Sequence, residues 1–503
     1  MQTTISPFVM VIFGATGDLT SRKLMPALYN LLSYKTLPER FFVVGFARRP
    51  FSHEEFRSLM KEAILRHIKG KKIDMEALNK LLQNLYYQQG LFEEKEPYEK
   101  LINLLSSFDK EIGACITRFF YLAAPPLNYS TILNKLASTR LSEGCGQGSS
   151  KWTRVLIEKP FGKDSDTAKK LEEQLTHTFE ERQIYRIDHY LAKENIQNIL
   201  AFRFANAMFE PLWNKDCIDH VQIVLAENSG IGNRGKFYEG VGALKDVVQN
   251  HLMAMLAYIA MDEPGSMSVD SIRAERVKVL QSIKKMTKEY IISNIIRGQY
   301  GKGLINERKV EGYREEKNIA PDSLTDTYIA MKLYLDNKRW DGVPFYLRTG
   351  KRMPFSAARI SIQFKKPTHK FFESIHEHKE HWHDNVLTFR IQPREGISLQ
   401  MLAKKPGLGF SLQNVKMDFS YESSFGHKLF DSYERLLIDS IRGDQTLFAT
   451  NSGFNATWKV VTDIEKVWAQ LPLPKFPNYQ AGSWGPKEAE ELISRDGRHW
   501  LLH

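Results

Sequence analysis

The stretch FVMVIFGATGDL, residues 8–19, decides the fold class of the first part of the chain. Phe8 to Phe13 are continuously apolar, as expected of a strand buried on both faces in a parallel sheet. The turn Gly14-Ala15-Thr16-Gly17-Asp18-Leu19 follows at once and leads into a helical pattern. This order predicts a dinucleotide-binding turn, in which Gly14 permits the bend and Gly17 lets the backbone approach a pyrophosphate. The full G-x-G-x-x-G pattern is missing, so a tight turn without a ligand is the alternative.

The second expected strand indicates which dinucleotide binds. Phe41 to Val44 is followed by Gly45-Phe46-Ala47-Arg48-Arg49. An acid near this position favours NAD by binding the ribose hydroxyls, whereas an arginine accommodates a 2′-phosphate. No acid lies between this strand and Pro50. Arg48 and Arg49 therefore predict NADP, with a solvated charge pair as the alternative.

Two later apolar segments predict further strands of the same parallel sheet. Phe119 to Pro126 reads as a strand that runs into a proline turn, and Val155 to Ile157 is followed by Glu158-Lys159-Pro160-Phe161-Gly162. Ligands bind at the carboxyl ends of such strands, which makes Lys159 a candidate site residue. A solvated lysine beside a proline turn is the alternative. Residues 54–104 read as amphipathic helices joined by charged turns.

The stretch RIDHYLAKE, residues 186–194, combines acids, bases, an imidazole and a phenol. An apolar-periodic segment follows, so the pattern predicts a helix with Asp188 as N-cap and with His189 and Tyr190 in its first turn. Lys193 would lie one turn after His189 on the same face. Backbone N–H groups, the positive helix end and these side chains would form an anion site. An ordinary capped helix start with a solvated charge pair is the alternative.

After about residue 187 the pattern becomes β-rich. The expected strands are Val221 to Ala226, Tyr328 to Leu335, Ile360 to Phe364, Val386 to Ile391 and Met417 to Tyr421. They are interrupted by longer helices, which predicts an α+β domain with a large, mostly antiparallel sheet. At this length the chain is expected to form two domains, 1–187 and 188–503, with the substrate site at their junction.

The expected helix from Leu244 to Tyr258 carries two candidate site residues. His251 lies at the edge of the apolar face, where a satisfied core histidine is the alternative. Asp246 is five residues earlier, so the two are not expected on one face of an α-helix. Glu227 and Lys351 stand at the ends of expected strands, where sites are often built, although each alone is compatible with a solvated charge.

Net charge, cysteine spacing and apolar runs indicate which ligands and which cellular compartment to expect. The formal net charge of +11 favours anionic partners, and no nucleic-acid motif accompanies it, so small phosphorylated ligands are expected. Cys115, Cys145 and Cys217 are widely spaced, which predicts neither a metal motif nor a disulfide framework and fits a reducing, cytoplasmic compartment. The sequence shows no signal-peptide pattern and no apolar run long enough to span a bilayer, so a soluble protein is expected.

Together these motifs resemble the glucose-6-phosphate dehydrogenase family, from about Phe8 to about Ala489. The motifs that carry the resemblance are Gly14-Ala15-Thr16-Gly17-Asp18-Leu19, Gly45-Phe46-Ala47-Arg48, Tyr121-Leu122-Ala123-Ala124-Pro125-Pro126, Glu158-Lys159-Pro160-Phe161-Gly162, Arg186-Ile187-Asp188-His189-Tyr190-Leu191, Gln249-Asn250-His251-Leu252, Arg339-Trp340-Asp341-Gly342-Val343-Pro344 and Lys405-Pro406-Gly407. Each motif is moderately specific, and their number and order make chance agreement very improbable.

The resemblance implies that a hydride passes from C1 of glucose 6-phosphate to NADP, giving 6-phosphogluconolactone as in the oxidative pentose phosphate pathway. It implies that His251 is the base and that Asp188 pairs with it, fixing the tautomer and stabilising the imidazolium. The other roles it implies are phosphate binding by His189, Tyr190, Lys193 and Lys351, sugar binding by Glu227 and Asp246, a place between substrate and cofactor for Lys159, 2′-phosphate binding by Arg48, and cofactor contacts by Tyr121 and by the glycine turn. A homodimer without nucleic acid, membrane or metal is expected.

Departures from the family pattern also bear on ligands. Ser356 stands where many members have a second basic residue on the phosphate side, and Arg352 is the candidate to take over its role. Ala192 stands where many members have glycine. Some eukaryotic members bind a second, structural NADP, and Arg348 and Arg390 match part of that site. Ala357, Ser361 and Trp484 replace its basic residues, so no second NADP is expected here.

Two rival functions remain open from the sequence. One is another NADP-linked sugar oxidoreductase, because a Glu-Lys-Pro strand end also occurs in glucose–fructose oxidoreductase-like enzymes. The other is a basic nucleic-acid-binding or regulatory protein that kept the fold without the activity. The candidate phosphate residues argue against the first rival, and the intact set Asp188, His189, Lys193 and His251 argues against the second.

Overall fold

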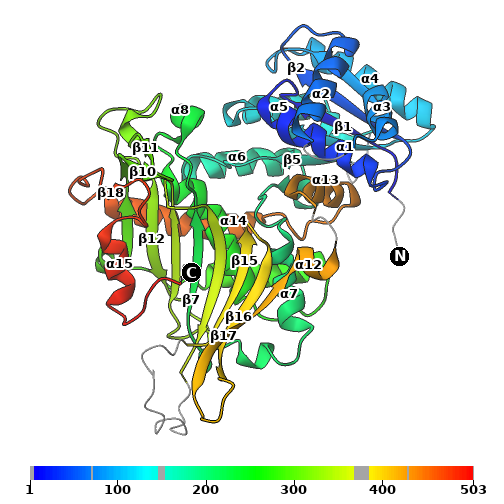
Figure 1. Ribbon diagram of the computed structural model, residues 1–503. Coiled ribbons are helices and arrows are strands. Elements are labelled where there is room, and N and C mark those ends of the chain that lie inside the picture. Colours follow the sequence, from blue (N-terminus) through cyan, green and yellow to red (C-terminus); the bar gives the residue numbers. More distant parts are fainter. Residues whose placement is uncertain (1–4, 69–71, 146–152, 367–383, 427–429, 502–503) are drawn as a thin grey trace. The chain divides into compact units, whose positions relative to one another are not determined.

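The computed structural model describes residues 5–68, 72–145, 153–366, 384–426 and 430–501 (Figure 1). The chain forms two units. Unit 1 comprises Met1–Ala192 and Phe430–Asn451, and unit 2 comprises Lys193–Leu429 and Ser452–His503. The sequence placed a division after residue 187, whereas the observed units divide after Ala192 and a C-terminal segment returns to unit 1.

Unit 1 is built on a six-stranded parallel sheet with the order β3-β2-β1-β4-β5-β6. The strands are β1 (Phe8–Phe13), β2 (Phe41–Ala47), β3 (Leu85–Gln89), β4 (Thr117–Leu122), β5 (Thr153–Ile157) and β6 (Ile184–Arg186). Every residue of β1, β2 and β4 is buried, which explains the continuous apolar sequences of β1 and β2 and of residues 119–122 in β4. The chain runs outward from β1 to β3 and then crosses to β4, so the order reverses between β1 and β4. This confirms the predicted Rossmann-type sheet and places its switch point at those two strands.

The helices of unit 1 pack beside this sheet. They are α1 (Met25–Ser33), α2 (His53–His67), α3 (Met75–Gln83), α4 (Glu96–Ile112), α5 (Tyr129–Ser138), α6 (Ser165–Thr178) and α13 (Ser432–Arg442), with a short π-helix η1 (Thr20–Leu24) before α1. α1 packs against α2, α3 and α13, while α5 packs against α6. The prediction that residues 54–104 contain only helices is wrong, because β3 lies within them. This strand is five residues long and only partly buried, so its alternation gave a weak signal.

The segment after β6 corrects a second prediction. Residues 188–192 form turns, and the next helix, α7 (Glu194–Phe204), begins only after Lys193. Asp188 is therefore not the N-cap of a helix. Its Oδ1 accepts a hydrogen bond from the backbone N–H of Tyr190 at 2.9 Å, and its carbonyl accepts one from Leu191 at 3.1 Å. An aspartate can close such a local turn as readily as it caps a helix, which is why the sequence was ambiguous here.

Unit 2 contains an eight-stranded sheet with the order β17-β16-β15-β14-β7-β13-β12-β8. The strands are β7 (Ile218–Ala226), β8 (Ile295–Gly298), β12 (Tyr328–Leu333), β13 (Phe345–Gly350), β14 (Ala357–Phe364), β15 (Val386–Gln392), β16 (Gly396–Lys404) and β17 (Leu412–Ser420). All neighbours are antiparallel except β7 and β13, which run parallel. The predicted large, mostly antiparallel sheet is thus confirmed.

Smaller elements complete unit 2. The short strands β9 (Tyr300–Gly301) and β18 (Tyr479–Gln480) pair in parallel, and β10 (Gly303–Ile305) and β11 (Arg308–Val310) form a hairpin. Besides α7, its helices are α8 (Gly235–Tyr238), the π-helix η8 (Leu244–Leu252), α9 (Met253–Ala260), α10 (Val269–Gln281), α11 (Lys288–Asn294), α12 (Tyr421–Phe425), α14 (Asn451–Trp468) and α15 (Lys487–Ser494). η8 contacts β7, β12 and β13 and continues directly into α9. Over the described ranges of both units, no helix is long and apolar enough to cross a membrane.

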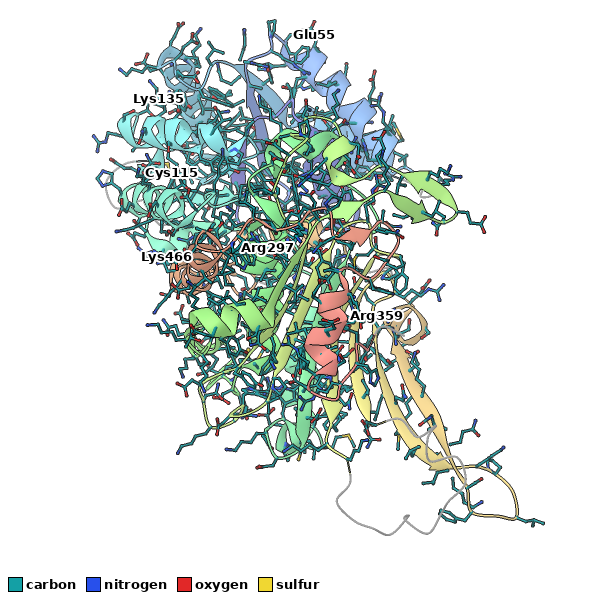
Figure 2. All side chains as sticks on the ribbon, turned by 90° about the vertical axis from the view of Figure 1, so that its left-hand side faces the viewer. Glu55, Cys115, Lys135, Arg297, Arg359 and Lys466 are labelled. Carbon is teal, nitrogen blue, oxygen red and sulfur yellow. A yellow bond between two sulfur atoms is a disulfide. The ribbon has the colours of Figure 1, made fainter. Side chains whose placement is uncertain are left out.

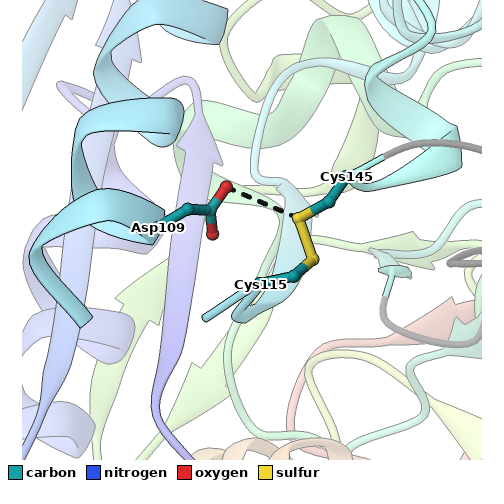
Figure 3. Close-up of side chains that lie close together, drawn as sticks. All are labelled: Asp109, Cys115 and Cys145. Atoms are coloured by element: carbon teal, nitrogen blue, oxygen red, sulfur yellow. Dashed lines mark hydrogen bonds between the residues drawn. A yellow bond between two sulfur atoms is a disulfide. The ribbon is translucent and has the colours of Figure 1, made fainter. Parts of the chain in front are cut away.

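Cys115 and Cys145 form a disulfide, so the prediction that the cysteines form no disulfide framework is wrong (Figures 2 and 3). They are 30 residues apart in sequence, but Cys115 lies just before β4 and Cys145 lies in the connection to the neighbouring strand β5. Asp109 and Arg118 lie beside the Cys145 sulfur, at 3.5 and 3.6 Å. Only strand adjacency brings the two thiols together, and this is not visible in their spacing. Because the absence of a disulfide partly supported the predicted cytoplasmic location, that support is lost.

Candidate active site

A pocket of about 390 Å³ lies at the switch point of unit 1. The predicted glycine turn forms one wall, since Gly14, Thr16 and Gly17 all line the pocket. Gly14 has a φ of +89°, and a Cβ there would lie 2.7 Å from the carbonyl oxygen of Ala123, so only glycine fits. The N–H of Gly17 donates to the carbonyl of Gly14 at 2.9 Å, which closes the turn. Asp18 lies just beyond it and pairs with Arg22 at 2.7 Å on the surface.

The predicted 2′-phosphate residue also lines this pocket. Arg48 and Arg49 are exposed, directly follow β2, and line the same pocket. The structure thus brings together the glycine turn and the arginines, which are about thirty residues apart in the sequence. The lining also includes residues 90–93 after β3, which the sequence did not indicate because β3 itself was missed.

Tyr121 and Lys159 lie at the carboxyl ends of β4 and β5. The Tyr121 side chain is buried, with 1% exposure, and its hydroxyl donates to Glu158 Oε1 at 2.6 Å. Burial and the neighbouring Glu158 raise its pKa well above the usual value for tyrosine, so it remains a donor. Lys159 follows β5 by two residues, at the edge predicted for ligands. The role of Tyr121 in cofactor contact stays a prediction, since its hydroxyl is already engaged.

In the turn after β6, Asp188 is buried and His189 packs against Tyr190, with ring centroids 4.8 Å apart. Backbone bonds to Asp188 therefore order both of the predicted phosphate-binding side chains. Asp188 belongs to unit 1 and His251 to unit 2, and their predicted pairing stays a prediction.

In unit 2, the parallel pairing of β7 and β13 brings Glu227 and Lys351 together. Ala226 lies opposite Gly350 in this register, so the next residue of each strand is a candidate site residue. The Lys351 ammonium forms an ion pair with the Glu227 carboxylate. The Glu227 N–H donates to the carbonyl of Gly350 at 2.9 Å, and the Lys351 N–H donates to that of Thr327 at 3.0 Å. Backbone bonds therefore hold both charged residues in place.

His251 and Asp246 both lie on η8. The expectation that they occupy different faces is wrong, because η8 is a π-helix in which hydrogen bonds join residues five apart. Residues spaced like Asp246 and His251 therefore lie on the same face. Both are buried, with 7% and 2% exposure. Asp246 is also 3.6 Å from a guanidinium nitrogen of Arg234.

Two residues that the sequence did not single out organise this part of unit 2. The ring of Tyr238 lies 5.3 Å from the Lys351 ammonium, and its pKa is raised well above the usual value by burial and then by the charges of Asp246, Asp326 and Glu227. Asp326 Oδ2 accepts a hydrogen bond from the first N–H of η8, that of Leu244, at 3.0 Å. Burial raises the pKa of this carboxyl, and the Leu244 N–H opposes the rise. Such tertiary contacts leave no local sequence signal.

Lys193 lies on another element of unit 2. It precedes α7, and its ammonium lies 3.8 Å from the carboxylate of Glu395. Burial raises the pKa of Glu395, and the charge of Lys193 opposes the rise. The acid was not anticipated, because it is about two hundred residues away in the sequence. Lys193 thus has a local acidic partner, as Lys351 has in Glu227.

The residues that depart from the family pattern are also engaged within unit 2. Ser356 donates to Asn228 Oδ1 at 2.8 Å and accepts from the Asn228 N–H at 3.0 Å. Arg352, the suggested substitute for a basic residue at that position, lies 3.2 Å from Glu316 Oε1. Arg348 is fully buried, and its guanidinium lies over the rings of Trp484 and Trp500. These contacts do not fit a second dinucleotide at Arg348, because aromatic side chains enclose the cation.

Unit 1 carries a glycine turn at the switch point of a parallel sheet, and unit 2 carries acids and bases at strand ends and on a buried helix. Together these features define a nicotinamide-dinucleotide-dependent oxidoreductase. Matches to two family models identify the family within this class of oxidoreductase. "Glucose-6-phosphate dehydrogenase, NAD binding domain" matches residues 11–198, and "Glucose-6-phosphate dehydrogenase, C-terminal domain" matches residues 200–501. The chain belongs to the glucose-6-phosphate dehydrogenase family.

Curated relatives and solved structures agree with this assignment. The chain is 46% identical to the glucose-6-phosphate 1-dehydrogenase of Chlamydia muridarum, over 98% of this chain and 96% of the relative. It is 42% identical to that of Aggregatibacter actinomycetemcomitans, over 98% and 96%. A solved structure of a glucose-6-phosphate dehydrogenase in complex with its substrate glucose-6-phosphate superposes with a TM-score of 0.89, at 32% identity, over 99% of this chain and all of that one.

The contact between Gly242 and Asp326 provides a test of how η8 is held. Gly242 has a φ of +69°, and a Cβ there would lie 2.6 Å from Asp326 Oδ1. Gly240 has a φ of +75° with nothing within 4 Å of its Cβ position, so Gly240→Ala measures backbone strain alone. We expect Gly240→Ala to cost roughly 1–2 kcal/mol and Gly242→Ala about 1–3 kcal/mol more in the free energy of unfolding. Urea denaturation measures both. Equal losses would show that Asp326 does not constrain this turn.

Proposed function

We propose that the protein oxidises glucose 6-phosphate at C1 to 6-phosphogluconolactone with NADP as the hydride acceptor. The observation that carries the proposal is the full-length structural similarity to a glucose-6-phosphate dehydrogenase solved with glucose-6-phosphate. Both family domains in this chain support it, together with charged side chains suited to a phosphorylated sugar. The rival readings, another sugar oxidoreductase or a non-catalytic protein, have no comparable support.

His251 takes the proton of the C1 hydroxyl as the hydride leaves C1. A base is needed because loss of the hydride alone would leave a protonated carbonyl. His251 is suited to this role, since it is buried on a rigid helix and imidazole accepts a proton near neutral pH. The family pattern assigns Asp188 to stabilise the resulting imidazolium. Bound NADP supplies the hydride acceptor.

Lysines and acids of unit 2 bind the sugar phosphate and the hydroxyls. Lys351 and Lys193 provide cations for the phosphate, together with His189 and Tyr190 of the turn after β6. Glu227 and Asp246 accept hydrogen bonds from sugar hydroxyls. The Glu227–Lys351 ion pair places an acid and a base side by side at the ends of β7 and β13, as an anionic, hydroxyl-rich ligand requires.

NADP binds in the pocket at the switch point of unit 1. The glycine turn offers close backbone approach for a pyrophosphate, and Arg48 offers a cation for the 2′-phosphate. The residues present fit the group, because two arginines line the same pocket as the glycine turn. Lys159 lies between cofactor and substrate, at the end of β5.

The protein forms a homodimer through unit 2. β17 is an edge strand of the large sheet, and an unpaired edge is a ready surface for association (Figure 1). The exposed apolar side chains on and beside it are Leu408, Phe410, Val415 and Met417. Exposed large apolar side chains that gather at a sheet edge are typical of a protein interface. A cytoplasmic location stays a prediction.

Replacing His251 with Asn tests the base. Asn keeps a similar size but cannot take up a proton, so binding of NADP and glucose 6-phosphate should persist while turnover falls about 10²- to 10⁴-fold. Calorimetric binding and steady-state kinetics measure the two effects. His177→Asn, at an exposed histidine of α6, controls for loss of an imidazole. Near-normal turnover of the His251 variant would eliminate this residue as the base.

Replacing Arg48 with Ala tests cofactor choice. Loss of the guanidinium should raise the KM for NADP on the order of tenfold or more and change that for NAD little, since only NADP carries the 2′-phosphate. Arg49→Ala is the matched control, because Arg49 lines the same pocket. Equal effects of Arg48→Ala on the two cofactors would remove the 2′-phosphate assignment.

A further inference from the structure

Tyrosines from three elements of unit 1 act on Glu158. Tyr121 of β4 donates to Oε1 at 2.6 Å, and Tyr433 of α13 lies near enough to affect the pKa of the carboxyl group. Tyr129 of α5 donates to the Glu158 backbone carbonyl at 3.1 Å. Glu158 is half-buried. Segments more than three hundred residues apart in the chain therefore converge on one side chain.

This carboxyl group is electrostatically coupled to candidate site residues. Burial raises the pKa of Glu158 to about 7, while hydrogen bonds from Tyr121 and Tyr433 and the charge of Lys159 oppose the rise. The charge of Asp188 adds to it. Burial also raises the pKa values of Tyr121 and Tyr433, so their hydroxyls remain donors around neutral pH. The groups that act on Glu158 thus include three candidate site residues, namely Tyr121, Lys159 and Asp188.

Packing alone does not account for an acid at this position. Removing a carboxylate from water is costly, and a neutral side chain of similar size would fill the space at lower cost. Glu158 instead precedes Lys159 directly, at the carboxyl edge of the parallel sheet where ligands bind. The two side chains also carry opposite charges, so the position of one affects the other.

We propose that Glu158 is a positioning residue for Lys159. Tyr121 holds its carboxylate and Tyr129 holds its backbone carbonyl, so the main chain and the negative charge next to Lys159 are fixed where this lysine reaches the substrate and the cofactor. The inference rests on the proposed function. When Glu158 takes up a proton, Lys159 loses this negative partner, and its placement for hydride transfer becomes less exact.

The kinetic test compares wild type with Glu158→Gln across pH. Gln has the size of the protonated acid and can still accept the Tyr121 hydrogen bond, so it mimics protonated Glu158 at every pH. The ratio of wild-type to variant kcat/KM for glucose 6-phosphate should be near one at pH 6 and rise on the order of tenfold by pH 8.5. Titration of the substrate phosphate and of the catalytic base affects both proteins and cancels in the ratio. A ratio that does not change with pH would overturn the positioning role.

A measurement of thermal stability checks, without using enzyme activity, the pH range in which the Glu158 carboxyl titrates. Because its folded-state pKa is raised, the contribution of Glu158 to stability is complete below the unfolded value near 4.5 and is lost as pH rises through about 7. Glu158→Gln lacks this loss, so its Tm relative to wild type should rise between pH 5.5 and pH 8. Glu62→Gln, at an exposed glutamate of α2, should show no such trend.

The two measurements separate the possible failures. A rising Tm difference with a constant kcat/KM ratio would make Glu158 a buried acid without a part in positioning, which overturns the proposal. A flat Tm difference would also overturn it, because the carboxyl would then not titrate where its surroundings require. If the wild-type protein did not turn over glucose 6-phosphate at all, the proposed function would fail, whereas the stability result would still report on the Glu158 environment. In a Tyr121→Phe background the carboxylate loses one hydrogen-bond donor, which raises the pKa of Glu158 further. The Tm difference between Glu158 and Glu158→Gln in that background should therefore rise at higher pH than in the wild-type background.

Discussion

Parallel pairing of strands is the constraint on which the candidate site of each unit depends. Parallel neighbours end at the same edge, so residues far apart in sequence are brought side by side just beyond that edge. In unit 1 this places the glycine turn after β1 next to Arg48 after β2 and near the ends of β4 and β5. In unit 2 the sheet is otherwise antiparallel, and the one parallel pair within it carries Glu227 and Lys351.

Charged side chains in these sites are paired with opposite charges at close range. Lys351 lies against Glu227, and Lys193 lies near Glu395. Both pairs offset part of the cost of removing an ion from water, and both hold a lysine where an anionic ligand can reach it. An anionic substrate suits such sites, because the cations that bind it are already held in place by neighbouring acids. The overall positive charge of the chain is consistent with this.

The sequence predicted most of what depends on local pattern. Buried β1, the glycine turn, the arginines after β2 and Lys159 after β5 follow from apolar runs and from the residues that end them. The sequence failed where tertiary structure decides. The π-helical turn that aligns Asp246 with His251 has no local signature, and neither has the return of α13 to unit 1. The Cys115–Cys145 bond and the tyrosines around Glu158 depend on strand adjacency, and Asp188 closes a turn where a helix cap was equally compatible.

The central claim is that the chain couples oxidation of a phosphorylated glucose to reduction of NADP. The most direct measurement follows NADPH formation at 340 nm with purified protein, glucose 6-phosphate and NADP, with NAD and unphosphorylated glucose in parallel. We expect rapid reduction that requires the sugar phosphate and is more efficient with NADP than with NAD. Equal activity on free glucose would contradict the phosphate site and favour a different sugar oxidoreductase. No reduction with any pair would contradict the assignment of an active enzyme.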